Sequence, residues 1–275
     1  MTGALKEIKM TTLWLDTETY SECDLKRHST HRYAEHPSTE ITVAQWAIDD
    51  GEPVVEDLTG ALPPSAQLVA HLTDPDIEVV AHNSRFDRTL MHHVWGIDVA
   101  IERWRDTMIK AMVHGLPGAL GKVGQVLGLD EDQAKDKRGT QLIRMFCKPG
   151  PINAIIKRKT RETHPVEWSE FLEYSRQDII AMRAIDRKLP SWNYRAGHPE
   201  LALWHLDQRI NDRGFAVDVE LAREATLASE SEKVRLKVAM IENTGGEVTS
   251  ASRRDQLVKH IVNFHGVSLP DMKAD

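Results

Sequence analysis

Short runs of apolar, β-branched and aromatic residues alternate with helix-like segments in the first part of the chain. Runs of this kind, bounded by turn residues, are typical of β-strands. Strands are therefore predicted at residues 11–18, 40–48, 53–58 and 77–82. Apolar positions spaced three or four residues apart predict helices, at 65–72 and 85–96. This alternation predicts an α/β fold.

From about residue 107 the pattern becomes mostly helical. Several short helices separated by Gly and Pro are predicted, followed by a long helix at about 166–188 that ends before Pro190. The stretch 148–165 is rich in Pro, Gly and charged residues, which predicts a mobile loop. A domain boundary is predicted near 190–200, with further helices beyond it.

The charge of the chain is unevenly distributed. The formal net charge is −7, which argues weakly against a partner made of nucleic acid. Residues 135–161, however, contain nine basic residues and one acid. An acidic metal site combined with a phosphate-binding arm would produce this asymmetry, and so would a solvated basic loop.

The cysteines and the apolar runs restrict the compartment. Cys23 and Cys147 lie in no metal-binding or redox spacing, which predicts reduced thiols in the cytoplasm. The sequence has no apolar run of about 18 residues, so a membrane span is excluded, and its first residues do not resemble a secretory signal.

Two acids end the first predicted strand. Asp16 and Glu18 in LWLDTET are two positions apart, so on a strand their side chains project from the same face. Gathering two like charges is costly unless a cation neutralises them. Carboxylate oxygens favour Mg²⁺ or Mn²⁺. Taken alone, however, this tripeptide pattern is common.

Two further acids stand on predicted helices. Asp87 lies in the first turn of the helix that follows a buried strand, with Asn83 at the helix start. This pair can contact a ligand, or it can simply cap the helix. Asp178 follows Tyr174 by four residues, so the two share a helix face. Alone, this second pair also fits a surface Asp beside a half-buried Tyr.

The combination of these motifs, in this order, is more specific than any part. The chain resembles the 3′–5′ exonuclease domain of DNA polymerase I-like (family A) enzymes, in the class with four acids and a tyrosine. The resemblance covers about residues 12–190. The segment 203–222, LWHLDQRINDRGFAVDVELA, is similar to the one that opens the polymerase portion of phage enzymes of this family.

The resemblance implies a fold and a domain organisation. The fold is a ribonuclease H-like mixed sheet flanked by helices, followed by a helical C-terminal segment. Residues 1–190 are expected to form the exonuclease domain and residues 191–275 the helical start of a polymerase domain. Because the palm and finger signatures of the polymerase do not occur, the chain is not expected to polymerise DNA. It is expected to be a fragment of a longer polymerase or one part of a split enzyme.

The resemblance also implies a mechanism with two Mg²⁺ or Mn²⁺ ions. Asp16 is expected to bridge both ions, Glu18 and Asp178 to hold the ion that activates water, and Asp87 to hold the second ion. Tyr174 is expected to orient the attacking water by a hydrogen bond.

The implied substrate is an unpaired 3′ end of DNA, from which 5′-mononucleotides are released as proofreading during replication. Single strands are held by phosphate contacts and base stacking. The candidates for these contacts are Asn83, Phe86, Lys157, Arg158 and Lys159. Phe86 also fits a position in the core.

The implied partner is a polymerase portion, in the same or a separate chain. No association with a membrane is expected. A phage-encoded protein of this kind is expected in the host cytoplasm. Two alternatives stay open: a non-catalytic module that binds single-stranded DNA or a replication partner, and an RNA-trimming exonuclease of the same fold.

Overall fold

The computed structural model describes residues 10–129, 137–151, 153–192 and 194–267. The chain divides into two compact units, one up to Asp212 and one from Arg213. The first unit contains the sheet and carries the candidate site.

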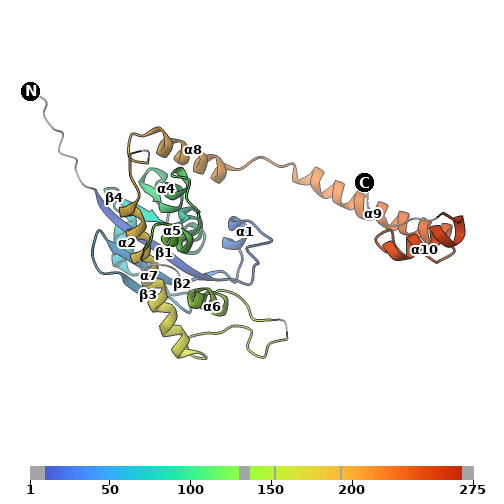
Figure 1. Ribbon diagram of the computed structural model, residues 1–275, viewed down its shortest axis with the longest axis horizontal. Helices are drawn as coiled ribbons and strands as arrows, with labels where there is room; N and C mark the ends of the chain where they lie inside the picture. The colour runs from blue at the N-terminus through green and yellow to red at the C-terminus, as the bar shows by residue number, and fades with distance from the viewer. Residues whose placement is uncertain (1–9, 130–136, 152, 193, 268–275) are drawn as a thin grey trace, which may run out of the picture. The chain divides into compact units, whose positions relative to one another are not determined.

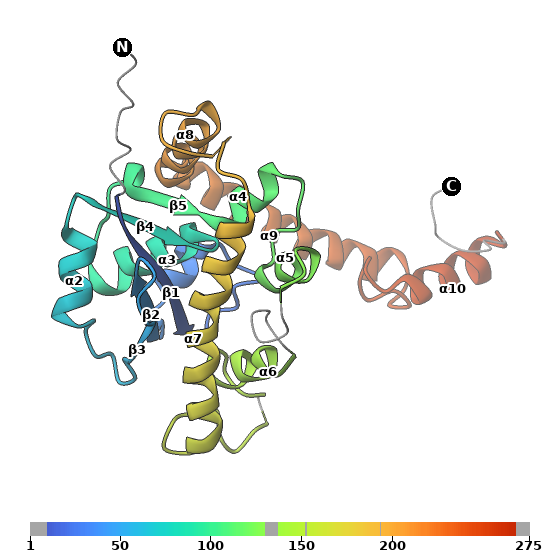
Figure 2. The ribbon, with the colours of Figure 1, turned by 60° about the vertical axis from the view of Figure 1, so that its left-hand side comes forward.

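A five-stranded mixed sheet forms the centre of the first unit (Figures 1 and 2). Its strands are β1 (Thr11–Tyr20), β2 (Glu40–Ile48), β3 (Val54–Asp57), β4 (Ile77–Ala81) and β5 (Trp104–Asp106). They lie in the order β3-β2-β1-β4-β5. β2 runs antiparallel to β1 and β3, whereas β4 runs parallel to β1 and β5. This is the predicted ribonuclease H-like arrangement, and the fold class is confirmed.

Helices cover both faces of the sheet. They are α1 (Thr30–Ala34), α2 (Ala66–Thr73), α3 (Ser84–Leu90), α4 (Thr107–Val113), α5 (Leu120–Val126), α6 (Lys137–Phe146) and α7 (Pro165–Lys188). Because successive side chains of a strand point to opposite faces, β1 contributes to two cores. Leu13 and Leu15 pack with residues of α2 and α3, whereas Trp14 packs with residues of α4, α5 and α7.

α7 positions the candidate site. It begins with Pro165 at its first turn, where a missing N–H costs nothing. It crosses the sheet and contacts β1, β2 and β3 (Figure 2). Its buried side chains include Ile179 and Met182, which pack against Trp14 of β1. The polar positions of the same face of β1 therefore lie under α7.

A buried aspartate joins α3 to β5. Asp106 accepts hydrogen bonds from the backbone N–H groups of Asn83 and Ser84, at 3.0 and 2.8 Å. It also caps α4 by accepting from the N–H of Met108 at 2.9 Å. These bonds fix the start of α3, and with it Asp87, at the carboxyl end of β4.

The boundary between the two compact units lies further along the chain than residues 190–200. α8 (Pro199–Arg213) places Leu201 and Trp204 in the core of the first unit, together with Tyr194. Asp212 also pairs with Arg88 of α3 at 2.5 Å. The compact units therefore separate after Asp212 rather than near 190, because these contacts join α8 to the sheet domain. The assignment of the two parts to exonuclease and polymerase stays a prediction.

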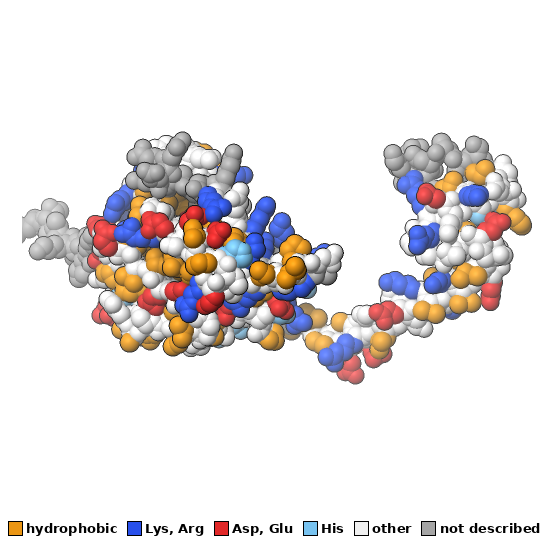
Figure 3. Space-filling view, turned by 90° about the horizontal axis from the view of Figure 1, so that it is seen from below, with side chains coloured by type: hydrophobic (Ala, Val, Ile, Leu, Met, Phe, Trp, Pro, Cys, Tyr) orange, Lys and Arg blue, Asp and Glu red, His pale blue; other side chains and the backbone are white. Residues whose placement is uncertain are grey.

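The second unit contains α9 (Val219–Asn243) and α10 (Arg254–His265). Asp218 caps α9 by accepting from the N–H of Leu221 at 2.9 Å. α9 has no buried residue, and its apolar side chains stand among charged ones on the surface (Figure 3). Among the residues that the structure describes, no helix combines the length and apolar character needed to cross a bilayer.

Most predicted elements occur at their predicted places, but α1 and β5 were not predicted and one predicted helix is divided. β5 was not predicted, because it is only three residues long and forms by pairing with β4. The helix predicted at 85–96 is divided into α3 and a π-helical turn, Met91–Trp95, closed by Gly96 at φ 66°. A glycine is favoured there because side chains disfavour that backbone conformation.

Candidate active site

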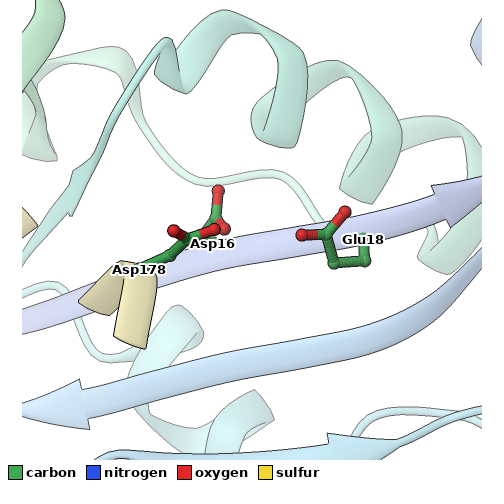
Figure 4. A group of neighbouring side chains, drawn as sticks. All are labelled: Asp16, Glu18 and Asp178. Carbon is green, nitrogen blue, oxygen red and sulfur yellow. The ribbon is translucent and has the colours of Figure 1, made fainter. Parts of the chain in front are cut away.

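Three carboxylates from distant parts of the sequence meet under α7. Asp16 and Glu18 of β1 and Asp178 of α7 each offer an oxygen, and these oxygens lie within 4.8 Å of one another (Figure 4). Glu18 and Asp178 are buried and Asp16 is half-buried. The two-residue spacing on β1 puts Asp16 and Glu18 on the face that α7 covers.

This arrangement fits a divalent metal ion. At an effective dielectric constant of about 20, two unit charges about 5 Å apart repel by about 3 kcal/mol. Three such charges in a mostly buried position need a cation to offset their repulsion. Their donor atoms are all carboxylate oxygens, the ligands preferred by hard cations such as Mg²⁺ and Mn²⁺.

Asp87 lies beside this group without contributing an oxygen to it. The carboxyl is 2% exposed and accepts a hydrogen bond from Thr17 Oγ1 at 2.7 Å. Burial, and next the negative charge of Asp16, raise the pKa of Asp87 well above its ordinary value. Asp16 therefore interacts electrostatically with Asp87 as well as with Glu18 and Asp178.

Neighbouring side chains hold the carboxylates in place, and sequence reasoning missed all of them. Gln45, opposite Asp16 in the β1–β2 register, donates from Nε2 to Asp16 Oδ2 at 2.5 Å. Cys147 donates from Sγ to Glu18 Oε2 at 3.7 Å. Burial and the Glu18 carboxylate raise the pKa of the Cys147 thiol. The one available signal was Gln45, a polar residue inside the apolar strand EITVAQWAI.

Tyr174 stands one turn before Asp178 on α7, and this spacing places both on one helix face. Its ring is nearly parallel to that of Phe171, with centroids 6.5 Å apart and an interplanar angle of 8°. On another side it meets the backbone of Gly139 in α6. The phenol is thus held between two helices next to a site acid.

Asn83 does not cap α3 with its side chain. Its backbone is left-handed, at φ 67° and ψ 47°, and the exposed side chain makes no capping hydrogen bond. Left-handed geometry is tolerated by Asn better than by most side chains. The amide is therefore available on the surface at the end of β4, close in sequence to Asp87.

Substituting Asn83 separates its backbone role from its side-chain role. Asn83→Ala is expected to lower the free energy of unfolding by about 1 kcal/mol, because alanine disfavours positive φ. Asn83→Gly is expected to leave it nearly unchanged and serves as the matched control, since both variants lose the amide. Urea unfolding measures the difference. Equal stability of the two variants would contradict a destabilising effect of alanine at the positive φ of position 83.

A cavity of about 680 Å³ opens beside Glu18. The aromatic rings of Tyr33 and Phe86 line it, and so do Cys147 and the basic residues Lys26 and Lys148. Phe86 is half-buried, and its ring lies 5.9 Å from that of Tyr33, centroid to centroid. An aromatic wall, two lysines and the carboxylates of Glu18, Glu22 and Asp24 thus meet in one opening. Sequence reasoning missed Tyr33 and Lys26 as site residues, whereas Lys148 belongs to the basic segment 135–161.

Two arginines of the basic segment, Arg158 and Arg161, contact strands of the sheet. Arg158 forms an ion pair with Glu40 and lies 3.9 Å from the centroid of the Tyr20 ring. Arg161 pairs with Asp57 at 3.1 Å. The two arginines are thus compensated by acids of β2 and β3. Lys135 and Asp136, at the start of the basic segment, lie outside the described residues.

Comparison with known proteins finds a phage relative. No protein-family model matches the chain. Over 225 residues, which are 80% of the chain, it is 36% identical to the DNA polymerase of Bacillus phage SP02. The chain spans about a third of that polymerase, since the match covers 34% of its length. The predicted relationship to a phage DNA polymerase is confirmed by this match.

Solved structures with partial similarity include NrnC and RNase D. Brucella melitensis NrnC is 18% identical, with a TM-score of 0.48 over 75% of this chain and 84% of that one. Trypanosoma brucei RNase D, in complex with RNA U12, is 15% identical, with a TM-score of 0.47 over 72% and 63%. Similarity at this level is too low to transfer a substrate from these proteins to this chain.

Proposed function

We propose that the chain is a metal-dependent 3′–5′ DNA exonuclease that releases 5′-mononucleotides from single-stranded 3′ ends. In this proposal it is the proofreading part of a phage-type DNA polymerase. The observation that carries it is the meeting of Asp16, Glu18 and Asp178 within 4.8 Å, with Asp87 beside Asp16. The phage polymerase relative supports the same function.

The four acids would hold two ions, Mg²⁺ or Mn²⁺. Such ions, when bound, stabilise negative charge on a scissile phosphate and favour deprotonation of the attacking water. Asp16 is the residue suited to serve both ions, because it belongs to the three-carboxylate group and also influences Asp87. Glu18 and Asp178 would then complete the site of the first ion, and Asp87 that of the second.

Tyr174 would orient the attacking water. It lies four residues before Asp178 on α7, and this spacing supports a position of the phenol on the side of the carboxylates. Phenols are weak acids at neutral pH. We therefore assign to Tyr174 a hydrogen bond that aligns the water, rather than removal of its proton.

The terminal nucleotide would enter the cavity beside Glu18. Phe86 and Tyr33 offer aromatic surface for a base, and Lys26 and Lys148 offer charge for phosphates. Stacking and phosphate contacts of this kind hold single strands with little sequence preference. Asn83 would add a polar contact, and Lys157 and Lys159 would contact the strand further from its end, whereas Arg158 is paired with Glu40.

A degradation assay tests this function. A single-stranded DNA carrying a 5′ label, incubated with the chain and Mg²⁺, is expected to shorten stepwise from its 3′ end and to release 5′-mononucleotides. EDTA is expected to stop the reaction and excess Mg²⁺ to restore it. An RNA of the same sequence is the parallel substrate. Binding without degradation would favour the non-catalytic module, and degradation of RNA alone would favour the trimming enzyme.

The proposed partner is a polymerase portion, in this chain's continuation or in a separate chain. The phage relative is about three times as long as the matched region, which leaves length for such a portion. α9 and α10 would belong to the helical start of the polymerase. The location in a host cytoplasm stays a prediction.

Lys157 and Lys159, in the Pro-, Gly- and charge-rich stretch 148–165 (the basic loop), make a testable contribution to strand binding. Lys157→Ala combined with Lys159→Ala is expected to flatten the dependence of affinity on salt, by about 0.7 in log–log slope for each phosphate that is no longer neutralised. Arg158 is left intact because it pairs with Glu40. Fluorescence anisotropy at several salt concentrations measures the slope.

The control for this prediction removes the same charge elsewhere, by Lys233→Ala and Lys237→Ala on exposed positions of α9. We expect it to leave the slope unchanged. If the loop variant keeps the slope of the unsubstituted chain, the loop makes no phosphate contacts.

A further inference from the structure

We propose that α6 is a positioning element for the site, with Gly139 near its start seating Tyr174 and Cys147, just after its end, orienting Glu18. This inference rests on the proposed function, because it concerns residues assigned there to water and metal. Gly139 and Cys147 touch neither water nor metal in this proposal. They act through the two side chains that do.

Gly139 leaves room for the Tyr174 ring. A Cβ atom at position 139 would overlap the ring at Cε2, Cδ2 and Cζ. Gly139 is buried, and it lies in the first turn of α6. Glycine is among the least favourable residues for a helix, so its presence here needs a local reason. The close approach of the tyrosine ring supplies that reason.

Cys147 connects the other end of α6 to the site. It follows α6 directly, is buried, and donates from Sγ to Glu18 Oε2 at 3.7 Å. A donor on one oxygen restricts how the carboxylate turns. Partners of this kind orient metal-binding side chains.

The C-terminal half of α6 packs against α7. Phe146 packs edge-on to Trp168 at 4.9 Å and stacks with Phe171 at 5.3 Å between ring centroids. Leu142 belongs to the same buried cluster. Because α7 also carries Tyr174 and Asp178, a shift of α6 would change the positions of Tyr174 and Glu18 relative to the other acids.

The first test replaces Gly139 with alanine and follows Tyr174 directly. The chain has four tyrosines, so protein labelled with 3-fluorotyrosine is expected to give four ¹⁹F resonances, of which Tyr174→Phe identifies one. Gly139→Ala is expected to shift that resonance and leave the other three. Thr140→Ala, at the exposed neighbouring position of α6, is the matched control and is expected to shift none.

Nuclease activity gives the second readout of the same variant. Gly139→Ala is expected to lower kcat about as much as Tyr174→Phe, with KM for the oligonucleotide nearly unchanged. Because both changes act on one phenol, the double variant is expected to be no slower than Tyr174→Phe alone. An unshifted Tyr174 resonance, or rate reductions that multiply in the double variant, would overturn the role of Gly139.

The second test measures metal affinity without activity. Mn²⁺ titration by calorimetry is expected to show about tenfold weaker binding for Cys147→Ala and partial recovery for Cys147→Ser, which keeps a donor. Cys23→Ala, the chain's other cysteine, is expected to bind as the unsubstituted chain does. Equal affinity of Cys147→Ala and the unsubstituted chain would overturn the role of Cys147.

These readouts separate the inference from the proposed function. A chain that binds no Mn²⁺ and degrades no oligonucleotide would overturn the proposed function and the role of Cys147 together. The ¹⁹F spectrum would still decide whether Gly139 seats Tyr174, because it depends on neither metal nor substrate.

Discussion

Asp16→Ala is expected to abolish Mg²⁺-dependent degradation of a single-stranded oligonucleotide, with a fall in rate of about a thousandfold or more. Asp16 belongs to the three-carboxylate group, and its charge also acts on Asp87. Its removal would therefore disturb the sites of both proposed ions, whereas loss of any other acid would disturb one. A thousandfold loss corresponds to about 4 kcal/mol in the barrier, within the range that metal ions contribute to such reactions.

Two controls make this result specific. Asp76→Ala removes an exposed acid before β4 and is expected to keep full activity. Asp16→Asn keeps an oxygen that can accept from Gln45, so it should fold normally while still losing activity. Circular dichroism checks the fold of each variant. Substantial activity in a folded Asp16→Ala protein would remove Asp16 from the mechanism.

The second large effect concerns a substitution that is expected to stabilise the protein without metal and to leave it less stable than the unsubstituted chain when metal is bound. Asp178→Asn is expected to abolish activity and, in EDTA, to raise the free energy of unfolding by about 1–3 kcal/mol. The reason is that Asp178 is 2% exposed and its carboxylate lies within 4.8 Å of those of Asp16 and Glu18, so the asparagine removes like-charge repulsion. Urea unfolding with and without metal measures both states.

With added Mg²⁺, the unsubstituted chain should be more stable than Asp178→Asn. The unsubstituted chain gains stability in proportion to the metal it binds, and the variant should gain much less. Asp186→Asn, two turns later on α7, is the matched control. Asp186 pairs with Lys110 at 2.7 Å, so its replacement is expected to destabilise the protein in either condition. A loss of stability for Asp178→Asn in EDTA would contradict mutual repulsion of the three carboxylates.

The elements of the sheet domain could be predicted from the sequence because each has a strong local pattern. β1, β2 and β4 are dense in apolar and β-branched residues, and the long helix α7 ends just before Pro190. β5 could not be predicted, since three residues carry too little pattern and the strand exists through its pairing with β4. The boundary between the units after Asp212 also depends on tertiary contacts, because α8 packs on the sheet domain.

The candidate acids were also accessible to sequence reasoning, because strand alternation and helix spacing predict which side chains share a face. Asp16 with Glu18 and Tyr174 with Asp178 follow those two rules. The ion pairs of the basic residues could not be predicted from the sequence. Arg158 looked available for phosphates, yet in the structure it pairs with Glu40, an acid more than a hundred positions away in the sequence.

The sequence by itself determined the local elements, the order of the acidic motifs and the relationship to a phage polymerase. Only the tertiary structure decided which groups surround those acids. Gln45 reaches Asp16 from β2 and Cys147 reaches Glu18 from the end of α6, while Gly139 near the start of α6 lies against Tyr174. Local periodicity carries no information on such contacts, because they arise when separate elements pack and each side chain meets a neighbour that the packing supplies.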